Sequence, residues 1–434
     1  MDLLPAIALL LLSVLVSVFA VVVLGKRHGW ASFSSLSITA FAVVYPLSGL
    51  CHIIGASNYY RGFFDSLAIH SNWATSELNL YASLLVLLCN ALLVMGCITS
   101  FPSVSIPRPF SYSRVTDKKL LLVSGFFFLA IGAAAFSKLI GSISFDGIDR
   151  SRVLSGGVAR YGFLSAWFCW GITLLYIWTL HRLKSNFLAA IIFIALSAAI
   201  AGNLFWTGGR SIIVVFLSPA LLYLVQHRPK AFRVGAPLIV AFVTFYIILL
   251  TYLRTEGYDR SGLNLYEAID WQVGRYSMVA YALDYVERNG LIFGRTLLFS
   301  AGSIFLSPLY FASEALRLDA TNSITHIIGR DILSSSDAQY IVPGIVPEMY
   351  MNFGLIGACL FSLLLGTLVR GIDRVRRNTA HDDVYRGLLV NYTGALVCLN
   401  LVNSTFFALL NYLFFYGAPL IALFVVSRFR FRNR

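Results

Sequence analysis

Charged residues are scarce in this sequence. Only 12% of the 434 residues are Asp, Glu, Lys or Arg, about half the fraction that a soluble domain carries. No Pro/Gly/Ser-rich linker and no internal repeat divides the chain. The six cysteines lie in apolar runs without a CxxC pair, which excludes a disulfide framework and a thiolate metal site. Apolar runs of 18 or more residues recur instead, so the sequence predicts a polytopic membrane protein.

These runs predict an all-α bundle of about 11 transmembrane helices that forms one integral membrane domain over residues 1–434. The first run has no basic segment before it and is followed by Lys26 and Arg27, so it is an uncleaved helix with its N-terminus outside. The predicted helices cover residues 3–24, 36–54, 78–99, 120–141, 161–180, 187–205, 211–226, 234–253, 349–369, 387–402 and 405–427.

The net charge of +13 resembles that of a nucleic-acid-binding protein, but its location argues against such a partner. The excess of Lys and Arg lies mostly in short loops on one side of the predicted bundle and in the tail SRFRFRNR. Positive loops face the cytoplasm. The pattern therefore predicts a C-terminus inside and no nucleic-acid partner.

One long polar segment, residues 254–348, separates the eighth and ninth predicted helices and is expected outside. It contains seven arginines and no lysine, and the arginine fork binds phosphate in a bidentate way. We expect amphipathic helices within it, one spanning 263–290, containing Arg275 and ending at Gly290. The apolar stretch 297–311 is too short for a span, so it either lies in the outer interface or re-enters the bundle.

Three arginines are candidates for binding an anionic group. Arg210 closes the short turn WTGGR before the seventh helix, where free backbone amides favour an anion; the structural alternative is a snorkelling arginine at the interface. Arg254 directly follows the eighth helix, and its structural alternative is pairing with Glu256 or Asp259. Arg275 is the weakest of the three, because its spacing alone favours a solvated side chain or a pair with Asp270.

The candidate general bases are His326 and Glu348. His326 is the one histidine of the outer segment, although a lone histidine is often structural. Glu348 stands at the outer start of the ninth predicted helix, where the helix dipole by itself favours an acid. Tyr350 and Asn352 follow it closely and suit sugar hydroxyls. No GxSxG, Walker A or HExxH motif occurs, so the sequence predicts neither nucleotide, metal nor another cofactor.

Two motifs resemble those of a known family. The turn TGGR (207–210) and the run ExYxNFGxxG (348–357), together with the long outer segment, resemble Wzy-type O-antigen or oligosaccharide repeat-unit polymerases. These are GT-C-like glycosyltransferases of the bacterial inner membrane. The resemblance implies a periplasmic reaction between two undecaprenyl-diphosphate-linked glycans, with Arg210 and Arg254 holding the diphosphate. It also implies a chain-length regulator and a flippase as partners.

Two other functions stay open. An O-antigen ligase or another GT-C glycosyltransferase is the nearest alternative, but Pro343 occupies the position at which ligases carry a histidine. A flippase or transporter of lipid-linked oligosaccharide is the alternative from another class. Transporters carry ionisable residues within their helices, whereas the predicted helices here are nearly free of charge inside. That contrast favours an enzyme with its active site on one face.

Overall fold

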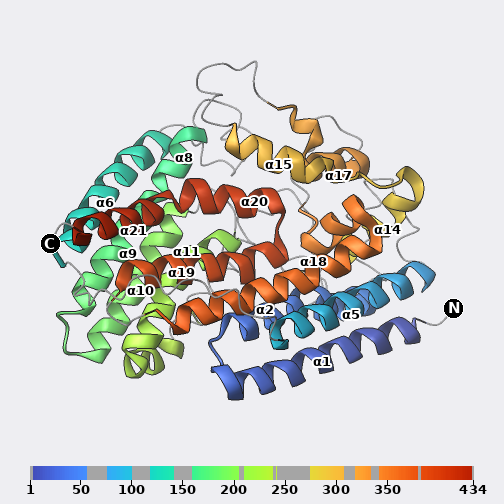
Figure 1. The fold of residues 1–434 in the computed structure, drawn as a ribbon, viewed down its shortest axis with the longest axis horizontal. Helices are drawn as coiled ribbons and strands as arrows, with labels where there is room; N and C mark the ends of the chain where they lie inside the picture. Colours follow the sequence, from blue (N-terminus) through green and yellow to red (C-terminus); the bar gives the residue numbers. More distant parts are fainter. Residues whose placement is uncertain are drawn as a thin grey trace. The chain divides into compact units, whose positions relative to one another are not determined.

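A computed structural model describes ten parts of the chain (Figure 1): residues 3–55, 76–99, 118–140, 159–204, 210–237, 241, 274–306, 318–333, 342–379 and 383–432. Every regular element in these parts is a helix. Among the described residues, seven helices are long and apolar enough to cross a membrane, and an eighth span arises if the bent pair Phe406–Tyr416 and Ala418–Arg428 is counted as one. The described residues therefore confirm an all-helical fold, consistent with a polytopic membrane helix bundle.

The long helices coincide with seven of the predicted ones. They are Leu4–Arg27, Phe33–Ile54, Glu77–Ile98, Lys118–Ile140, Tyr161–Leu180, Asn186–Leu204 and Ile345–Arg377. The predicted helices 211–226 and 387–402 match apolar helices that are shorter than a span, Ile212–His227 and Val384–Leu399. Most of the predicted helix 234–253 lies outside the described residues. The total of eleven transmembrane helices thus stays a prediction.

The chain forms two compact units. The first comprises Met1–Ser105, Asp259–Arg374 and Leu396–Asn411. Its helices are α1 (Leu4–His28), α2 (Phe33–Ala42), the π-helical η1 (Val43–Leu47), α3 (Ser48–Gly55), α5 (Ser76–Ile98), α14 (Tyr276–Asn289), α15 (Arg295–Phe305), η5 (Ala320–Asn322), α17 (Ile324–Leu333), most of α18 (Ile345–Arg377), η6 (Leu396–Leu401) and α20 (Phe406–Asn411).

The second unit comprises Ile106–Tyr258, Val375–Ala395 and Tyr412–Arg434. Its helices are α6 (Lys118–Ile140), α8 (Ala159–Ser165), α9 (Trp167–Leu180), α10 (Asn186–Leu204), α11 (Arg210–His227), α19 (Val384–Ala395), η7 (Tyr412–Tyr416) and α21 (Ala418–Arg432). Glycines let α6 and α9 approach closely, since a Cβ on Gly132 would lie 2.1 Å from the backbone nitrogen of Phe168. Small residues at such contacts are typical of membrane helices.

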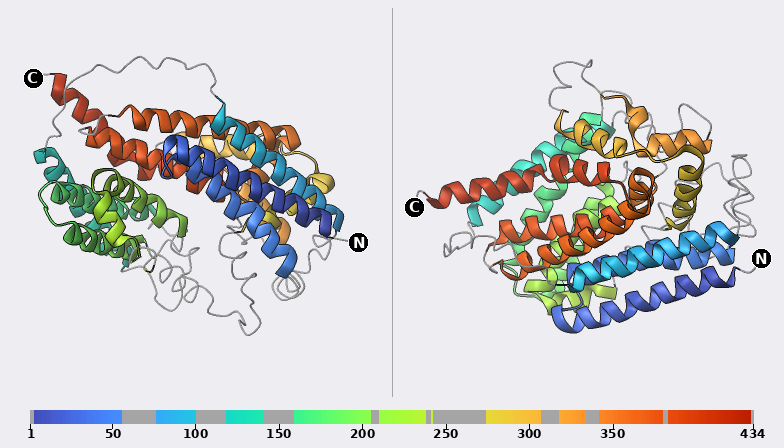
Figure 2. Two further views of the ribbon diagram at one scale, coloured as in Figure 1. Left: turned by 90° about the horizontal axis from the view of Figure 1, so that it is seen from below. Right: turned by 45° about the vertical axis from the view of Figure 1, so that its right-hand side comes forward.

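A buried polar network joins α1 to α5, which run side by side in Figure 2. The Asn90 amide donates to the backbone oxygen of Ser13 at 2.8 Å and to the Ser17 hydroxyl at 2.9 Å. All three side chains are buried. Hydrogen bonds between helices substitute for the missing hydrophobic driving force in lipid, so this network fixes the pairing of α1 with α5.

The far end of α18 holds two charges that bind the ends of other helices. The Arg370 guanidinium donates to the backbone oxygens of Cys97 and Ile98, at the C-terminus of α5. Asp373 is 4% exposed and accepts from the backbone nitrogens of Phe33 and Ser34 at 2.7 and 2.9 Å, at the N-terminus of α2. Each charge has the sign that the helix dipole favours.

This arrangement corrects the predicted end of the ninth helix. The sequence placed that end at residue 369 and a loop after it, but α18 continues to Arg377. Arginine has high helix propensity, and the contacts of Arg370 and Asp373 hold the extra turns against α5 and α2.

The contact between α5 and α18 depends on glycine, which leads to a prediction. A Cβ on Gly366 would lie 2.3 Å from the backbone oxygen of Leu93, whereas a Cβ on Gly371 of the same helix would meet nothing within 4 Å. We expect Gly366→Ala to destabilise the protein by about 1 to 3 kcal/mol through overpacking. Gly371→Ala is the matched control and should be neutral or slightly stabilising. Thermal unfolding in detergent, followed by size-exclusion chromatography, measures both; equal midpoints would contradict the close contact.

Candidate functional site

The candidate site is built around a break in α18. Gly354 has φ 67° and ψ −158°, a conformation that interrupts the helix and that glycine adopts readily. The backbone oxygens of Met351 and Asn352 accept instead from the backbone nitrogens of Ile292 and Phe293, at 2.9 and 3.0 Å. Unpaired backbone groups are costly in apolar surroundings. The α14–α15 loop therefore stabilises the end of the first half of α18.

Glu348 lies within this first half, one turn from its start. Its side chain is 0% exposed. Oε2 accepts a hydrogen bond from the backbone nitrogen of Phe406, the first residue of α20, at 2.8 Å, whereas Oε1 has no hydrogen-bond partner among the described residues. The carboxyl group thus bonds to the start of another helix, in addition to lying in the first turn of α18, where the helix dipole favours an acid.

Asn352 lies one turn beyond Glu348 on the same face of α18. Its Nδ2 donates to Thr296 Oγ1 of α15 at 2.8 Å and to the backbone oxygen of Glu348 at 2.7 Å. Its Oδ1 lacks a hydrogen-bond partner in the described structure, and the side chain is 0% exposed. Each buried polar atom without a partner costs about 1 to 3 kcal/mol. Acceptor oxygens in this state, on two residues one helical turn apart, are suited to hydroxyl groups of a bound molecule.

Tyr45 and Arg275 lie beside the N-terminal end of α18. The Tyr45 hydroxyl, within the π-helical η1, donates to the backbone oxygen of Val402 at 3.0 Å and accepts from the backbone nitrogen of Val346 at 3.3 Å. Gly344 has φ +86°, and a Cβ there would lie 2.6 Å from Tyr45 Oη and 3.3 Å from Arg275 Cγ. Arg275 is therefore near the start of the helix that carries Glu348.

Arg275 does not lie within a helix, contrary to the prediction for residues 263–290. Its backbone angles are φ −137° and ψ 8°, and α14 begins at the next residue, Tyr276. The Arg275 backbone nitrogen donates to the backbone oxygen of Val44 in η1 at 3.0 Å, which holds this residue in a non-helical conformation. The predicted end at Gly290 is confirmed, with φ 77° after Asn289.

Tyr350 is separated from the other two residues of the motif. Two positions along a helix point to nearly opposite sides, so Tyr350 faces away from Glu348 and Asn352. It packs against a hydrophobic cluster of α14, α17 and α18 made of Met278, Tyr281, Ala282, Ile324, Ile328, Ile332 and Met351. The structure therefore groups Glu348 with Asn352 and Thr296, and places Tyr350 elsewhere.

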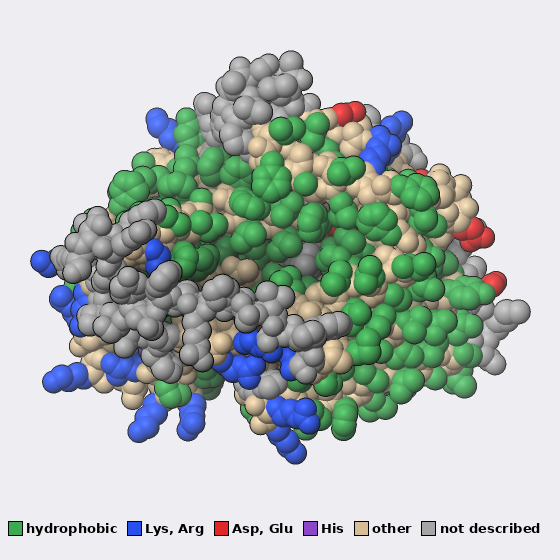
Figure 3. All heavy atoms as spheres, in the orientation of Figure 1, with side chains coloured by type: hydrophobic (Ala, Val, Ile, Leu, Met, Phe, Trp, Pro, Cys, Tyr) green, Lys and Arg blue, Asp and Glu red, His purple; other side chains and the backbone are tan. Residues whose placement is uncertain are grey.

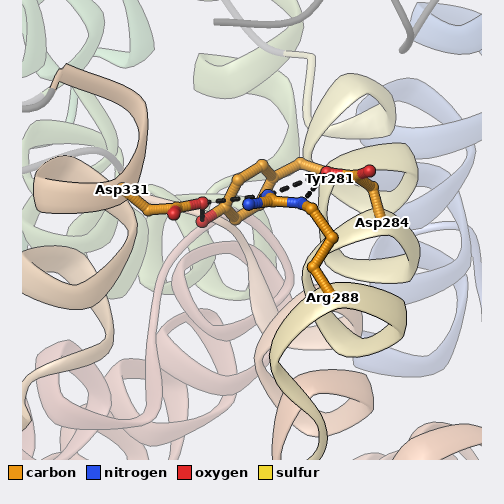
Figure 4. Close-up of polar contacts among 4 residues, drawn as sticks. All are labelled: Tyr281, Asp284, Arg288 and Asp331. Carbon is orange, nitrogen blue, oxygen red and sulfur yellow. Dashed lines mark hydrogen bonds and ion pairs between the residues drawn. The ribbon is translucent and has the colours of Figure 1, made fainter.

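A polar cluster ties α14 to α17 (Figure 4). The Tyr281 hydroxyl donates to Asp331 Oδ2 at 2.7 Å, and Arg288 bonds to both Asp331 and Asp284, at 3.1 and 2.9 Å. Burial and then the bond to Asp331 raise the pKa of Tyr281 well above its usual value, so the hydroxyl stays a donor. Because Asp331 is engaged in this way, the cluster has a structural role in holding α17.

His326 also lies on α17, with its side chain partly exposed. Its backbone nitrogen bonds to Ser323, and no hydrogen bond in the described parts joins it to Glu348 or Asn352. Arg210 is the first residue of α11 in the second unit, and its side chain lies outside the described residues; Arg254 lies outside them entirely. Among the described residues, no group of three or more His, Cys, Asp and Glu could hold a metal ion.

Sequence reasoning missed two members of this site, Thr296 and Tyr45. Thr296 stands at the edge of an apolar run and has no motif to mark it. Tyr45 carried a usable signal, because it precedes Pro46 inside an apolar run, and an internal proline distorts a helix. Distortions of the π-helical type often occur at functional sites.

Comparison with family models, curated proteins and solved structures gives no match for this chain. The proposed function therefore depends on two features: the geometry of the buried pair Glu348 and Asn352, and the resemblance of the motifs.

The pair leads to a prediction about stability. Glu348→Gln keeps the side-chain volume and an oxygen for the Phe406 amide, and it removes a buried ionisable group. We expect an unfolding midpoint equal to or above that of the wild type. Glu348→Ala should destabilise by about 1 to 3 kcal/mol, because the Phe406 amide loses its partner. If the Gln variant is as unstable as the Ala variant in the same detergent, the carboxylate is a structural element.

Proposed function

We propose that this protein is a membrane glycosyltransferase that polymerises undecaprenyl-diphosphate-linked repeat units on the periplasmic face of the bacterial inner membrane. Its product is O-antigen or a similar surface polysaccharide. The single observation that supports this most is that Glu348 and Asn352, both fully buried, each have an oxygen without a hydrogen-bond partner among the described residues. Hydroxyl groups of an acceptor sugar are donors that satisfy such oxygens. The motif ExYxNFGxxG, which resembles that of repeat-unit polymerases, contains both residues.

In the proposed reaction, a hydroxyl of the acceptor glycan donates its hydrogen to Glu348 Oε1, and a neighbouring hydroxyl binds Asn352 Oδ1. The acceptor oxygen forms a bond to the anomeric carbon of the donor while its proton passes to Glu348. The bond between that carbon and the diphosphate oxygen breaks, and undecaprenyl diphosphate leaves with the bonding electrons. Atoms and charge balance without a metal or a nucleotide.

Arginines supply the positive charge that the leaving diphosphate requires. Fixed cations at the developing charge stabilise the transition state. Arg275 is the candidate whose position near the start of α18 is described. Arg210 is included because it closes the TGGR motif, and Arg254 because it opens the arginine-rich segment 254–348.

Glu348 is the preferred base over His326. Its orientation is fixed by the bond to Phe406, and Asn352 beside it offers a second oxygen for the same sugar. His326 lies on α17, whose buried face packs into the cluster around Met351, and it has no described contact with that pair.

A transporter of lipid-linked oligosaccharide is the second candidate, and one observation favours it. Discontinuous helices with a buried ionisable residue are typical of secondary transporters, and α18 is broken at Gly354 with Glu348 in its first half. In that case the carboxylate would bind a coupling proton or cation in place of a sugar hydroxyl.

The test is a ladder gel of surface polysaccharide from a strain that lacks the native gene. Glu348→Gln and Arg210→Ala should each collapse the ladder to a single repeat unit at normal protein level. Glu287→Gln, at an exposed position of α14, is the matched control and should keep the full ladder.

The other outcomes overturn parts of the proposal. An unchanged ladder in Glu348→Gln removes this residue as the base. Loss of even the single repeat unit from the surface, at normal protein level, supports the transporter or the ligase instead.

A further inference from the structure

Helix α15 turns small polar residues toward the protein and large apolar residues outward. It buries Thr296, Ser300 and Ile304, whereas Leu298 and Phe305 are 74% and 62% exposed. Its first residue, Arg295, is also exposed. A helix on the surface of a water-soluble protein shows the opposite pattern. Small polar residues facing the protein and large apolar ones facing outward are typical of a helix in contact with lipid.

The neighbouring helices have the ordinary pattern. Helix α14 buries Tyr276, Met278, Val279, Ala280, Tyr281 and Ala282, and its exposed residues include Glu287 and Arg288. Helix α17 buries Ile324, Ile328 and Ile332 and exposes Arg330. Both helices are therefore suited to water. The exposed side chains therefore change from polar on α14 to largely apolar on α15, over the few residues that separate the two helices.

The apolar surface of α15 continues into that of a candidate membrane span. Phe353 of α18 packs on the loop before α15, since a Cβ on Gly294 would lie 3.1 Å from its ring. Beyond the break, α18 exposes Ile356, Leu360, Leu364 and Leu368, one helical turn apart. Figure 3 shows hydrophobic side chains over the part of the molecule where Figure 1 places α15.

The length of α15 limits how it can meet the membrane. Its 11 residues extend about 16 Å at 1.5 Å per residue, roughly half of the 30 Å hydrocarbon core. It cannot cross the bilayer. An interfacial helix instead buries one apolar face among the headgroups and the first part of the acyl chains.

We infer that α15 is an interfacial membrane helix, whose outward residues Leu298 and Phe305, together with Phe293 of the preceding loop, contact bilayer lipid while Thr296 faces Asn352. The water-facing helices α14 and α17 lie on the aqueous side of it. The candidate site behind α15 is thereby adjacent to the bilayer surface. This inference rests on burial and continuity and holds whether or not the protein is a glycosyltransferase.

Site-directed spin labelling in phosphatidylglycerol/phosphatidylethanolamine vesicles tests the inference. Single cysteines replace Leu298 and Phe305, and matched controls replace Glu287 and Arg330, in full-length protein whose native cysteines are changed to serine or alanine. Oxygen partitions into lipid, and the nickel complex NiEDDA stays in water. Labels at 298 and 305 should relax several-fold faster with oxygen than with NiEDDA, and the two controls should show the reverse.

Two results would overturn it. Faster relaxation by NiEDDA at 298 and 305 places α15 in water. Low accessibility to both reagents means that protein, from this chain or from a second copy, covers the face. All four positions are exposed, so their substitution should not disturb folding, and a symmetric size-exclusion peak verifies this before labelling. No substrate is present, so the result is independent of the proposed reaction.

Discussion

The structure of the first unit depends on satisfying backbone groups where its helices break. In water a broken helix exposes its amides and carbonyls to solvent, but apolar surroundings require partners from the protein. At Gly354 the partners are the backbone nitrogens of Ile292 and Phe293. At the ends of α2 and α5 they are Asp373 and Arg370 of α18. Helix α18 thus positions α2 and α5. Its break at Gly354 fixes the end of the half that carries Glu348.

The same break explains why the polar groups of the candidate site are buried together. The first half of α18 is enclosed by η1, α15 and the start of α20, which each contribute one hydrogen-bonding group. These groups satisfy one oxygen of Glu348 and the amide nitrogen of Asn352 but leave an oxygen of each side chain without a described partner. Departures from full hydrogen bonding of this kind are concentrated at functional sites.

Hydropathy located the long helices correctly because an apolar run of this length has few alternatives to a helix in lipid. It was less accurate at their ends. The sequence placed the ninth helix at 349–369, but α18 runs from Ile345 to Arg377, since contacts of Asp373 and Arg370 with other helices extend it. Motif spacing also grouped Tyr350 with Glu348 and Asn352, although the helical period places it on the opposite face.

The sequence by itself determined the helical class, the apolar segments and the chemistry available to the polar segment 254–348, because these follow from composition and periodicity. Only the tertiary structure decided which polar groups meet. Thr296, Phe406 and Tyr45 are distant from Glu348 along the chain, and long-range packing brings them around the first half of α18. The outward position of Leu298 and Phe305 on α15 likewise became visible only from burial, because a short apolar run does not reveal which of its sides meets the protein.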